Sequence, residues 1–128
     1  MTNDSCAIWA PRTLSLLRII SGYLFLLHGI EKLFVAHIPL GSLMGAAGII
    51  EFIGGILILL GLFGRIAAFI CSGEMAFAYF MGHVAAKGHV LTPVHNGGDA
   101  AVLFCFVFLL IAASGSGPFS LDSLRKKS

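Results

Sequence analysis

The chain has 128 residues, of which 58% are hydrophobic and only 11% are charged. Soluble domains average about 45–50% apolar and about 25% charged residues, so this composition excludes an ordinary soluble domain and indicates that the apolar surplus faces lipid. The formal net charge of +2 comes from scattered bases and not from a basic stripe, so no nucleic-acid partner is expected.

Four apolar segments predict an all-α fold, namely an integral membrane four-helix bundle. A helix rises about 1.5 Å per residue, so roughly 20 residues cross a hydrocarbon core of about 30 Å. The predicted helices cover residues 14–35, 44–62, 66–86 and 97–115. The whole chain, 1–128, is expected to form a single transmembrane domain, with residues 122–128 as a basic C-terminal tail.

The breaks between these segments predict how the helices are connected. Pro11 and Arg12 precede the first apolar run and no small-residue cleavage site follows it, so this run is expected to remain as a helix and not to act as a signal peptide. Pro39 lies in the first break. The very short turn at 61–65 requires its two helices to be antiparallel neighbours. Residues 87–98 form the third break, which completes an up-down topology.

The distribution of basic residues predicts the orientation. With four spans, both termini and the middle turn lie on one side of the membrane. That side holds Arg12, Arg18, Arg65, Arg125, Lys126 and Lys127, and the other side holds only Lys32 and Lys87. Cytoplasmic segments carry the excess of Lys and Arg, so both termini are expected in the cytoplasm.

Glycines crowd the second predicted helix. They are Gly45, Gly48, Gly54, Gly55 and Gly61. In lipid, small residues let helix backbones approach closely, so this helix is expected to be the most tightly packed one. The alternative is the ordinary tolerance of membrane helices for glycine.

Ionisable side chains inside the apolar segments are the candidate functional residues. Each costs at least about 2.5–3.5 kcal/mol in lipid unless it is paired or hydrated. The antiparallel order brings several of them into one polar layer in the outer part of the bundle, above a cavity that Met75 and Tyr79 could line. The candidate ligand-binding residues are His28, Lys32, Glu51, Met75, Tyr79, His83, Asn96 and Asp99. Among them, Glu51 is flanked by isoleucine and phenylalanine and needs a partner, for which Lys32 is expected.

Structural alternatives stay open for these residues. Lys32 could extend to the lipid headgroups, a single histidine is often structural, and Asp99 after two glycines is a suitable N-cap. Arg18 is placed outside the layer because it lies near the cytoplasmic end, and Glu74 because it lies about half a turn away in angle from His83.

The remaining motifs predict no metal site. His89 and His95 lie near His83 in sequence but match no specific ligand spacing. The cysteines Cys6, Cys71 and Cys105 form no CxxC pair, and the two inside apolar runs are interpreted as inert hydrophobes.

Several sequence motifs resemble the DoxX family over roughly residues 13–122. The motifs that carry the resemblance are Leu17-Arg18-Ile19, His28-Gly29-Ile30-Glu31-Lys32-Leu33-Phe34, Glu51-Phe52-Ile53-Gly54-Gly55, Leu60-Gly61-Leu62-Phe63-Gly64-Arg65, Met75, His83, Asn96-Gly97-Gly98-Asp99 and Gly115-Ser116-Gly117-Pro118-Phe119-Ser120-Leu121-Asp122. The family more often has Glu at the position of Asp99. The resemblance implies a four-helix protein of the bacterial cytoplasmic (inner) membrane. Relatives are associated with membrane redox systems, including a thiosulfate:quinone oxidoreductase subunit, and with oxidative stress.

Three functions follow as hypotheses. The first is a redox-linked subunit that binds a quinone or other small molecule in the polar layer, with His28 and His83 relaying protons. This chain shows no electron-carrier motif or self-contained catalytic motif, so a redox partner protein is expected; haem is left open, and catalytic residues are not assigned. The second is a membrane scaffold or assembly factor without a ligand. The third is a small-solute permease, which with four short helices would need a homo-oligomer.

Overall fold

The computed structural model describes residues 3–127, with the side chains of residues 4–126. The described part of the chain is helical and contains no strand, which confirms the all-α prediction. Its elements are α1 (Asn3–Ile30), η1 (Glu31–Val35), α2 (Leu43–Leu60), α3 (Gly64–Ala78), η2 (Tyr79–Val84), α4 (Ala85–Lys87), α5 (Pro93–Asn96), α6 (Asp99–Ser114) and α7 (Leu121–Lys127).

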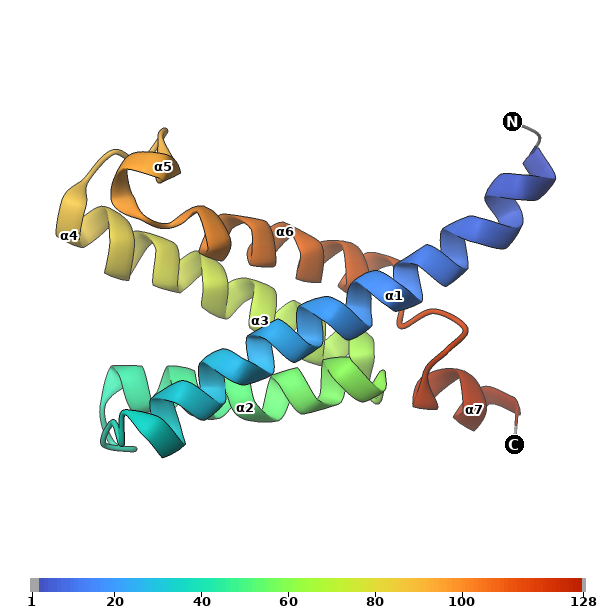
Figure 1. Ribbon diagram of the computed structural model, residues 1–128, viewed down its shortest axis with the longest axis horizontal. Helices are drawn as coiled ribbons and strands as arrows, with labels where there is room; N and C mark the ends of the chain where they lie inside the picture. Colours follow the sequence, from blue (N-terminus) through green and yellow to red (C-terminus); the bar gives the residue numbers. More distant parts are fainter. Residues whose placement is uncertain (1–2, 128) are drawn as a thin grey trace.

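The first helix begins earlier than predicted. The sequence placed its start at residue 14, but α1 begins at Asn3 and contains Pro11. A proline removes one backbone hydrogen bond and crowds the preceding turn, yet the helix can continue on both sides of it. The N-terminal turns of α1 extend beyond the rest of the bundle (Figure 1). In this segment Arg12 stacks on the Trp9 ring at 5.5 Å.

Other predicted boundaries also shift. The helix predicted at 66–86 begins at Gly64 and continues from α3 through η2 to Lys87 with helical backbone angles. The helix predicted at 97–115 is α6, and the preceding break holds the short helix α5. The basic tail forms α7, whose start is capped by Oγ of Ser120, which accepts from the backbone of Ser123. Asp122 anchors this segment to the bundle by accepting from the backbone of Phe63.

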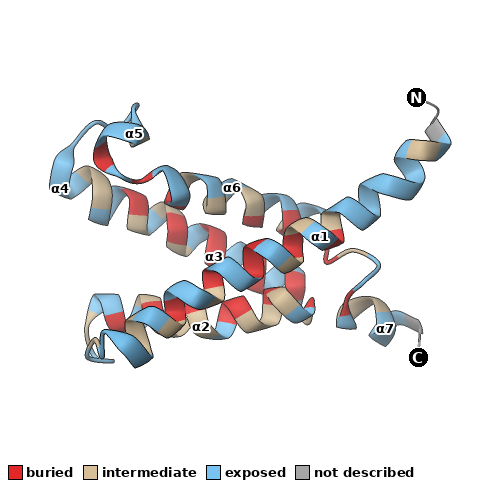
Figure 2. Cartoon of the chain, viewed as in Figure 1, coloured by how far each residue is buried: buried red, intermediate tan, exposed pale blue. Residues whose placement is uncertain are grey.

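The four long helices pack as two pairs. α1 packs on α2, α3 packs on α6, and α2 contacts α3 (Figure 1). Phe25 of α1 joins the pairs, because its ring lies 4.8 Å from that of Phe108 and 5.6 Å from that of Phe104 in α6. Figure 2 shows the buried residues gathered along the facing sides of these helices.

Glycines bring α1 and α2 into close backbone contact. An added Cβ at Gly55 would lie 2.7 Å from the Cα of Leu26, and one at Gly29 would lie 2.5 Å from the backbone nitrogen of Phe52. A Cβ at Gly48 would lie 3.1 Å from the Cβ of Lys32. These contacts support the interpretation that the glycines of the second helix serve packing.

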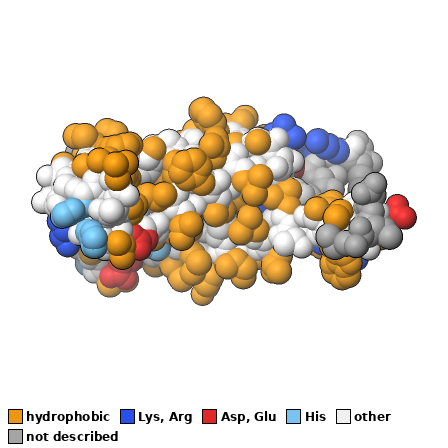
Figure 3. Space-filling view, turned by 90° about the horizontal axis from the view of Figure 1, so that it is seen from above, with side chains coloured by type: hydrophobic (Ala, Val, Ile, Leu, Met, Phe, Trp, Pro, Cys, Tyr) orange, Lys and Arg blue, Asp and Glu red, His pale blue; other side chains and the backbone are white. Residues whose placement is uncertain are grey.

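The surface is largely apolar. Figure 3 shows hydrophobic side chains over the middle of the molecule, with histidine and charged groups toward the ends. Residues Asp4–Val35 and Leu43–Leu60 form two helices long and apolar enough to cross a membrane, and α6 is a shorter apolar helix. Two of the four predicted spans thus meet this criterion, and the four-span antiparallel arrangement stays a prediction.

Candidate functional site

A partly buried ion pair joins Lys32 of η1, the segment that continues α1, to Glu51 of α2. Nζ of Lys32 lies 2.6 Å from Oε1 of Glu51, and the Glu51 side chain is only 2% exposed. The glycine contacts described above explain the geometry, because Gly48 leaves room for Lys32 beside α2. The pairing predicted from sequence is therefore confirmed.

Two segments that hold candidate residues of the predicted polar layer are π-helical. Lys32 lies in η1, and Tyr79 and His83 lie in η2, at the ends of α1 and α3 respectively. π-helical turns are rare and occur frequently at functional sites. The π-helical segments therefore coincide with segments that hold candidate functional residues.

Glu74, which was placed outside the predicted layer, lies within electrostatic range of the ion pair. The charges of Glu51 and Lys32 both act on the Glu74 carboxyl group. Oε2 of Glu51 and Oε2 of Glu74 are buried and have no hydrogen-bond partner. The three side chains, Lys32, Glu51 and Glu74, form what we call the carboxylate cluster.

The height of Glu74 along the bundle could have been predicted from the sequence. Glu51 precedes Gly61 by ten residues and Glu74 follows Gly64 by ten residues. Two antiparallel helices joined by a short turn place such residues at the same height, about 15 Å from the turn. The exclusion of Glu74 rested on its angle from His83 around the same helix. Its height relative to Glu51, on the other side of the turn, indicates the opposite.

A second polar network lies at the end of the α3–α6 pair that is distant from the chain termini. Nδ2 of Asn96 donates to Oη of Tyr79 at 3.1 Å, and Oη of Tyr79 donates to the carbonyl of Val90 at 2.8 Å. Oδ1 of Asn96 accepts from the backbone of Gly98 at 2.8 Å. Asn96 is 1% exposed and Tyr79 is 5% exposed. These bonds hold the loop between α4 and α6 against η2.

His83 is attached to this network at one nitrogen. Its Nδ1 lies 3.2 Å from the carbonyl oxygen of Asn96, and because a carbonyl only accepts, Nδ1 is the donor. Nε2 is the other ring nitrogen, and it takes no part in this hydrogen bond. The His83 side chain is half-buried.

The predicted single layer divides into these two groups. No hydrogen bond or ion pair between described residues joins the carboxylate cluster to the Tyr79–Asn96 network. The α1–α2 and α3–α6 pairs diverge toward the end that lies away from both chain termini (Figure 1). Equal depth along the helices therefore does not bring all the candidates into contact.

Three candidates lie away from both groups. The exposed His28 bonds the carbonyl of Leu24 in its own helix at 2.8 Å and packs edge-on against Phe104. Met75 and Tyr79 were expected to line a cavity beneath the layer. Both lie instead in the packed apolar core. Asp99 is exposed in the first turn of α6, and Gly98 holds the N-cap position considered for it.

The sequence analysis missed a polar cluster at the opposite end of the bundle. Arg18 is 1% exposed and donates to the carbonyls of Ser116, of Phe119 at 2.8 Å and of Leu59 at 3.4 Å. Arg18 therefore binds the segment after α6 to the end of α2. The available signal was an arginine inside an apolar run, since such a residue needs internal acceptors.

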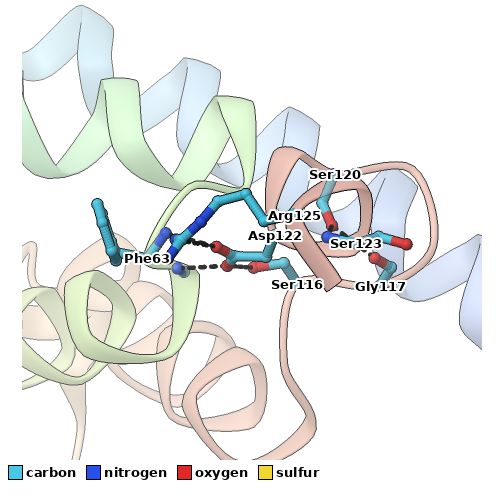
Figure 4. Close-up of polar contacts among 8 residues, drawn as sticks. Phe63, Ser116, Gly117, Ser120, Asp122, Ser123 and Arg125 are labelled. Carbon is cyan, nitrogen blue, oxygen red and sulfur yellow. Dashed lines mark hydrogen bonds and ion pairs between the residues drawn. The ribbon is translucent and has the colours of Figure 1, made fainter. Parts of the chain in front are cut away.

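Asp122 completes this second cluster (Figure 4). Its carboxylate accepts hydrogen bonds of 2.8 Å from the backbone of Phe63, the backbone of Gly64 and Oγ of Ser116. Arg125 lies 3.5 Å from Asp122 and stacks over the Phe63 ring at 4.5 Å. Partial burial raises the pKa of Asp122, but these hydrogen bonds and the Arg125 charge outweigh it and hold the pKa below its usual range.

The helical fold of the described residues and their largely apolar exterior indicate a membrane protein. The particular family follows from comparison: the chain belongs to the DoxX family, whose family model, described as DoxX, matches residues 13–84. That segment contains the whole carboxylate cluster.

A relative extends the similarity to nearly the full chain. A Haemophilus influenzae protein described as an uncharacterized protein is 45% identical over 123 residues, covering 90% of this chain and 92% of the relative. No solved structure matches this chain.

Proposed function

We propose that the protein spans the bacterial inner membrane four times, with both termini in the cytoplasm. The helical run from Gly64 to Lys87 would cover about 36 Å, enough for a third span. α6 covers about 24 Å by the same rise and would reach both interfaces with its polar flanks. The excess of basic residues at the end that carries the termini supports the orientation.

We further propose that the protein is a redox-linked subunit that binds a quinone or a similar small molecule at the carboxylate cluster. The observation that carries this proposal is the buried Lys32–Glu51 pair, whose second carboxylate oxygen has no partner, beside a further unpartnered oxygen of Glu74. A buried polar atom without a partner costs about 1–3 kcal/mol, so a ligand that donates a hydrogen bond to these oxygens would remove that cost.

The donors and acceptors of the cluster suit both redox forms of such a ligand. The ammonium group of Lys32 can donate to the carbonyl oxygen of a quinone. A quinol instead carries two hydroxyl groups, which can donate to the free oxygens of Glu51 and Glu74. Carboxyl groups in this position would also take up or release the two protons that accompany transfer of two electrons.

The electrons would come from or go to a partner protein. The described cysteines Cys6, Cys71 and Cys105 are all free, and no group of three or more described His, Cys, Asp or Glu residues is arranged to hold a metal ion. This chain would then supply the ligand site and the proton-exchanging groups, and the partner would supply the electron carrier.

The test is ligand content after purification in mild detergent. Native mass spectrometry and optical spectra should show a bound quinone in wild type. The amount of quinone bound to Glu51→Gln should be lower by a factor of at least about ten, because a hydrogen bond to a charged group is worth about 1.5–3 kcal/mol. Glu31→Gln, which changes an exposed acid next to Lys32, is the matched control and should retain the quinone. Wild-type protein that holds no quinone and copurifies with no redox protein would contradict the proposal.

A scaffold without a ligand is the second candidate. The observation that favours it is the Tyr79–Asn96 network, whose hydrogen bonds are all made within the chain. In that case the double variant Lys32→Met/Glu51→Leu should fold and retain full function in the cell, because apolar residues can replace a buried ion pair. A folded double variant without function would favour the ligand site.

A further inference from the structure

A groove of about 660 Å³ opens at the bundle end that carries both termini. It lies between the start of α3 and the segment that follows α6. Three cationic side chains line it, Arg65, Arg125 and Lys126, together with one acidic side chain, Asp122. Neither the ligand site proposed above nor the family match accounts for this groove.

The single acid does not neutralise the groove. The Asp122 carboxylate is engaged by two backbone N–H groups, the Ser116 hydroxyl and Arg125 (Figure 4). Arg65 and Lys126 form no hydrogen bond or ion pair with another described residue. Two cationic groups therefore face the groove with their charge unmatched.

The Arg65 side chain lies close to the backbone at the end of α6. Gly115 has a φ of +91°, and an added Cβ there would lie 3.2 Å from Nε of Arg65. The guanidinium group thus lies over the turn at which α6 ends. Arginine presents a planar set of donors that matches the oxygens of a phosphate group.

Apolar side chains continue from this groove along the bundle. Ile66 is 65% exposed and lines it, and Phe69 and Ile70, the next exposed residues of α3, are 65% and 54% exposed. In α7, Leu124 is 61% exposed and directly precedes the basic residues Arg125 and Lys126. A charged recess next to exposed apolar helix surface matches a molecule with an anionic head and acyl chains.

We propose that this groove binds the phosphate-bearing headgroup of an anionic phospholipid, whose acyl chains lie along α3. The site lies at the end of the apolar helices, which is the depth of the headgroup layer. The same phosphate chemistry could come from a free anion, but the continuous apolar surface favours the lipid. The site is independent of the redox function proposed for the carboxylate cluster.

The test measures lipid retention by the full-length protein in a zwitterionic detergent. Native mass spectrometry compares short-chain phosphatidylglycerol with phosphatidylcholine, and the variants are Arg65→Gln/Lys126→Gln and the control Arg12→Gln, an exposed base at the same end. Each basic residue near anionic lipid contributes about a five-fold effect on binding. The double variant should therefore lose about 25-fold in phosphatidylglycerol affinity, and the control should bind like wild type.

Folding and the nature of the anion are checked separately. Circular dichroism should show the same helix content in all variants, and Arg65→Lys, which keeps the charge but loses the planar donor set, should retain more affinity than the double variant. Equal retention of the two lipids by wild type, or unchanged binding by the folded double variant, would overturn the proposal. Inorganic phosphate that displaces the lipid and stabilises the protein equally well would also overturn it, because the acyl chains would then contribute nothing.

Discussion

Asp122 shows how one side chain can hold a terminus onto a bundle. It accepts hydrogen bonds from the first backbone N–H groups of α3 and from Ser116, although 58 residues separate it from Gly64. The exposed N–H groups at a helix start have no partner within the helix, and a carboxylate is a favourable acceptor there. Asp122 therefore caps α3 from a distant part of the sequence.

This capping predicts a pH-dependent stability. The pKa of Asp122 is lowered in the folded state, so its contribution is present above the unfolded value of about 4 and is lost as the pH falls through the folded pKa. Asp122→Ala should lower stability at pH 7 by about 1–2 kcal/mol, the usual cost of losing a cap. Thermal unfolding followed by circular dichroism in detergent should show this difference, and at pH 3 a smaller one.

Ser123→Ala is the control for that measurement, because only the backbone of Ser123 takes part in the adjacent hydrogen bond to Ser120. The control should unfold like wild type at both pH values. An Asp122→Ala deficit that does not change between pH 7 and pH 3 would show that the carboxylate charge is not the source of the stabilisation.

At the level of elements, the glycines decide how closely the helices pack. Gly29 lies where α1 touches the backbone of α2, whereas Gly73 of α3 has no atom within 4 Å of an added Cβ. Both glycines are helical, so the intrinsic effect of an alanine is the same at both positions. Any difference between the two substitutions therefore reports the contact between α1 and α2.

Gly29→Ala should destabilise the protein by about 1–3 kcal/mol, because the backbones of α1 and α2 would have to separate. Gly73→Ala should instead be neutral or stabilise it by up to about 1 kcal/mol, since alanine is the better helix former. Unfolding in detergent, compared for both variants, provides the measurement. Equal behaviour of the two variants would show that α1 and α2 do not pack closely through Gly29.

At the level of the whole molecule, the cysteines offer a direct test of the proposed orientation. Cys6 is exposed near the N-terminus, whereas Cys71 is buried and Cys105 is half-buried in the helices. Gly41 and Leu91 lie in the two outer loops, and Leu91 is 90% exposed. With cytoplasmic termini, Cys6 and the two outer loops lie on opposite sides of the membrane.

In intact spheroplasts, a membrane-impermeant maleimide should label Gly41→Cys and Leu91→Cys, each in a Cys6→Ser background. Wild-type Cys6 should react only after the membrane is permeabilised. Labelling of Cys6 in intact spheroplasts would reverse the orientation, and opposite results for Gly41→Cys and Leu91→Cys would contradict the four-span arrangement. Labelling is quantified by gel shift.

Much of the fold and one part of the site could be predicted from the chain. The apolar composition predicts a membrane protein, and the isolated Glu51 in an apolar segment predicts its pairing with Lys32, because a buried charge must be compensated. Glu74 was missed although its equal spacing from the turn was visible. The first helix begins at Asn3 and not at the predicted residue 14, because proline weakens a helix locally without always ending it.

Tertiary structure alone decided which of these polar residues meet. Sequence positions give the depth of a residue along a helix, but contact also depends on how each helix is rotated and on the angle between helix pairs. For that reason Lys32 meets Glu51, while His83 joins Asn96 at a separate place. The contacts of Arg18 with residues 116 and 119 likewise arise only when the chain after α6 folds back, which local sequence patterns do not encode.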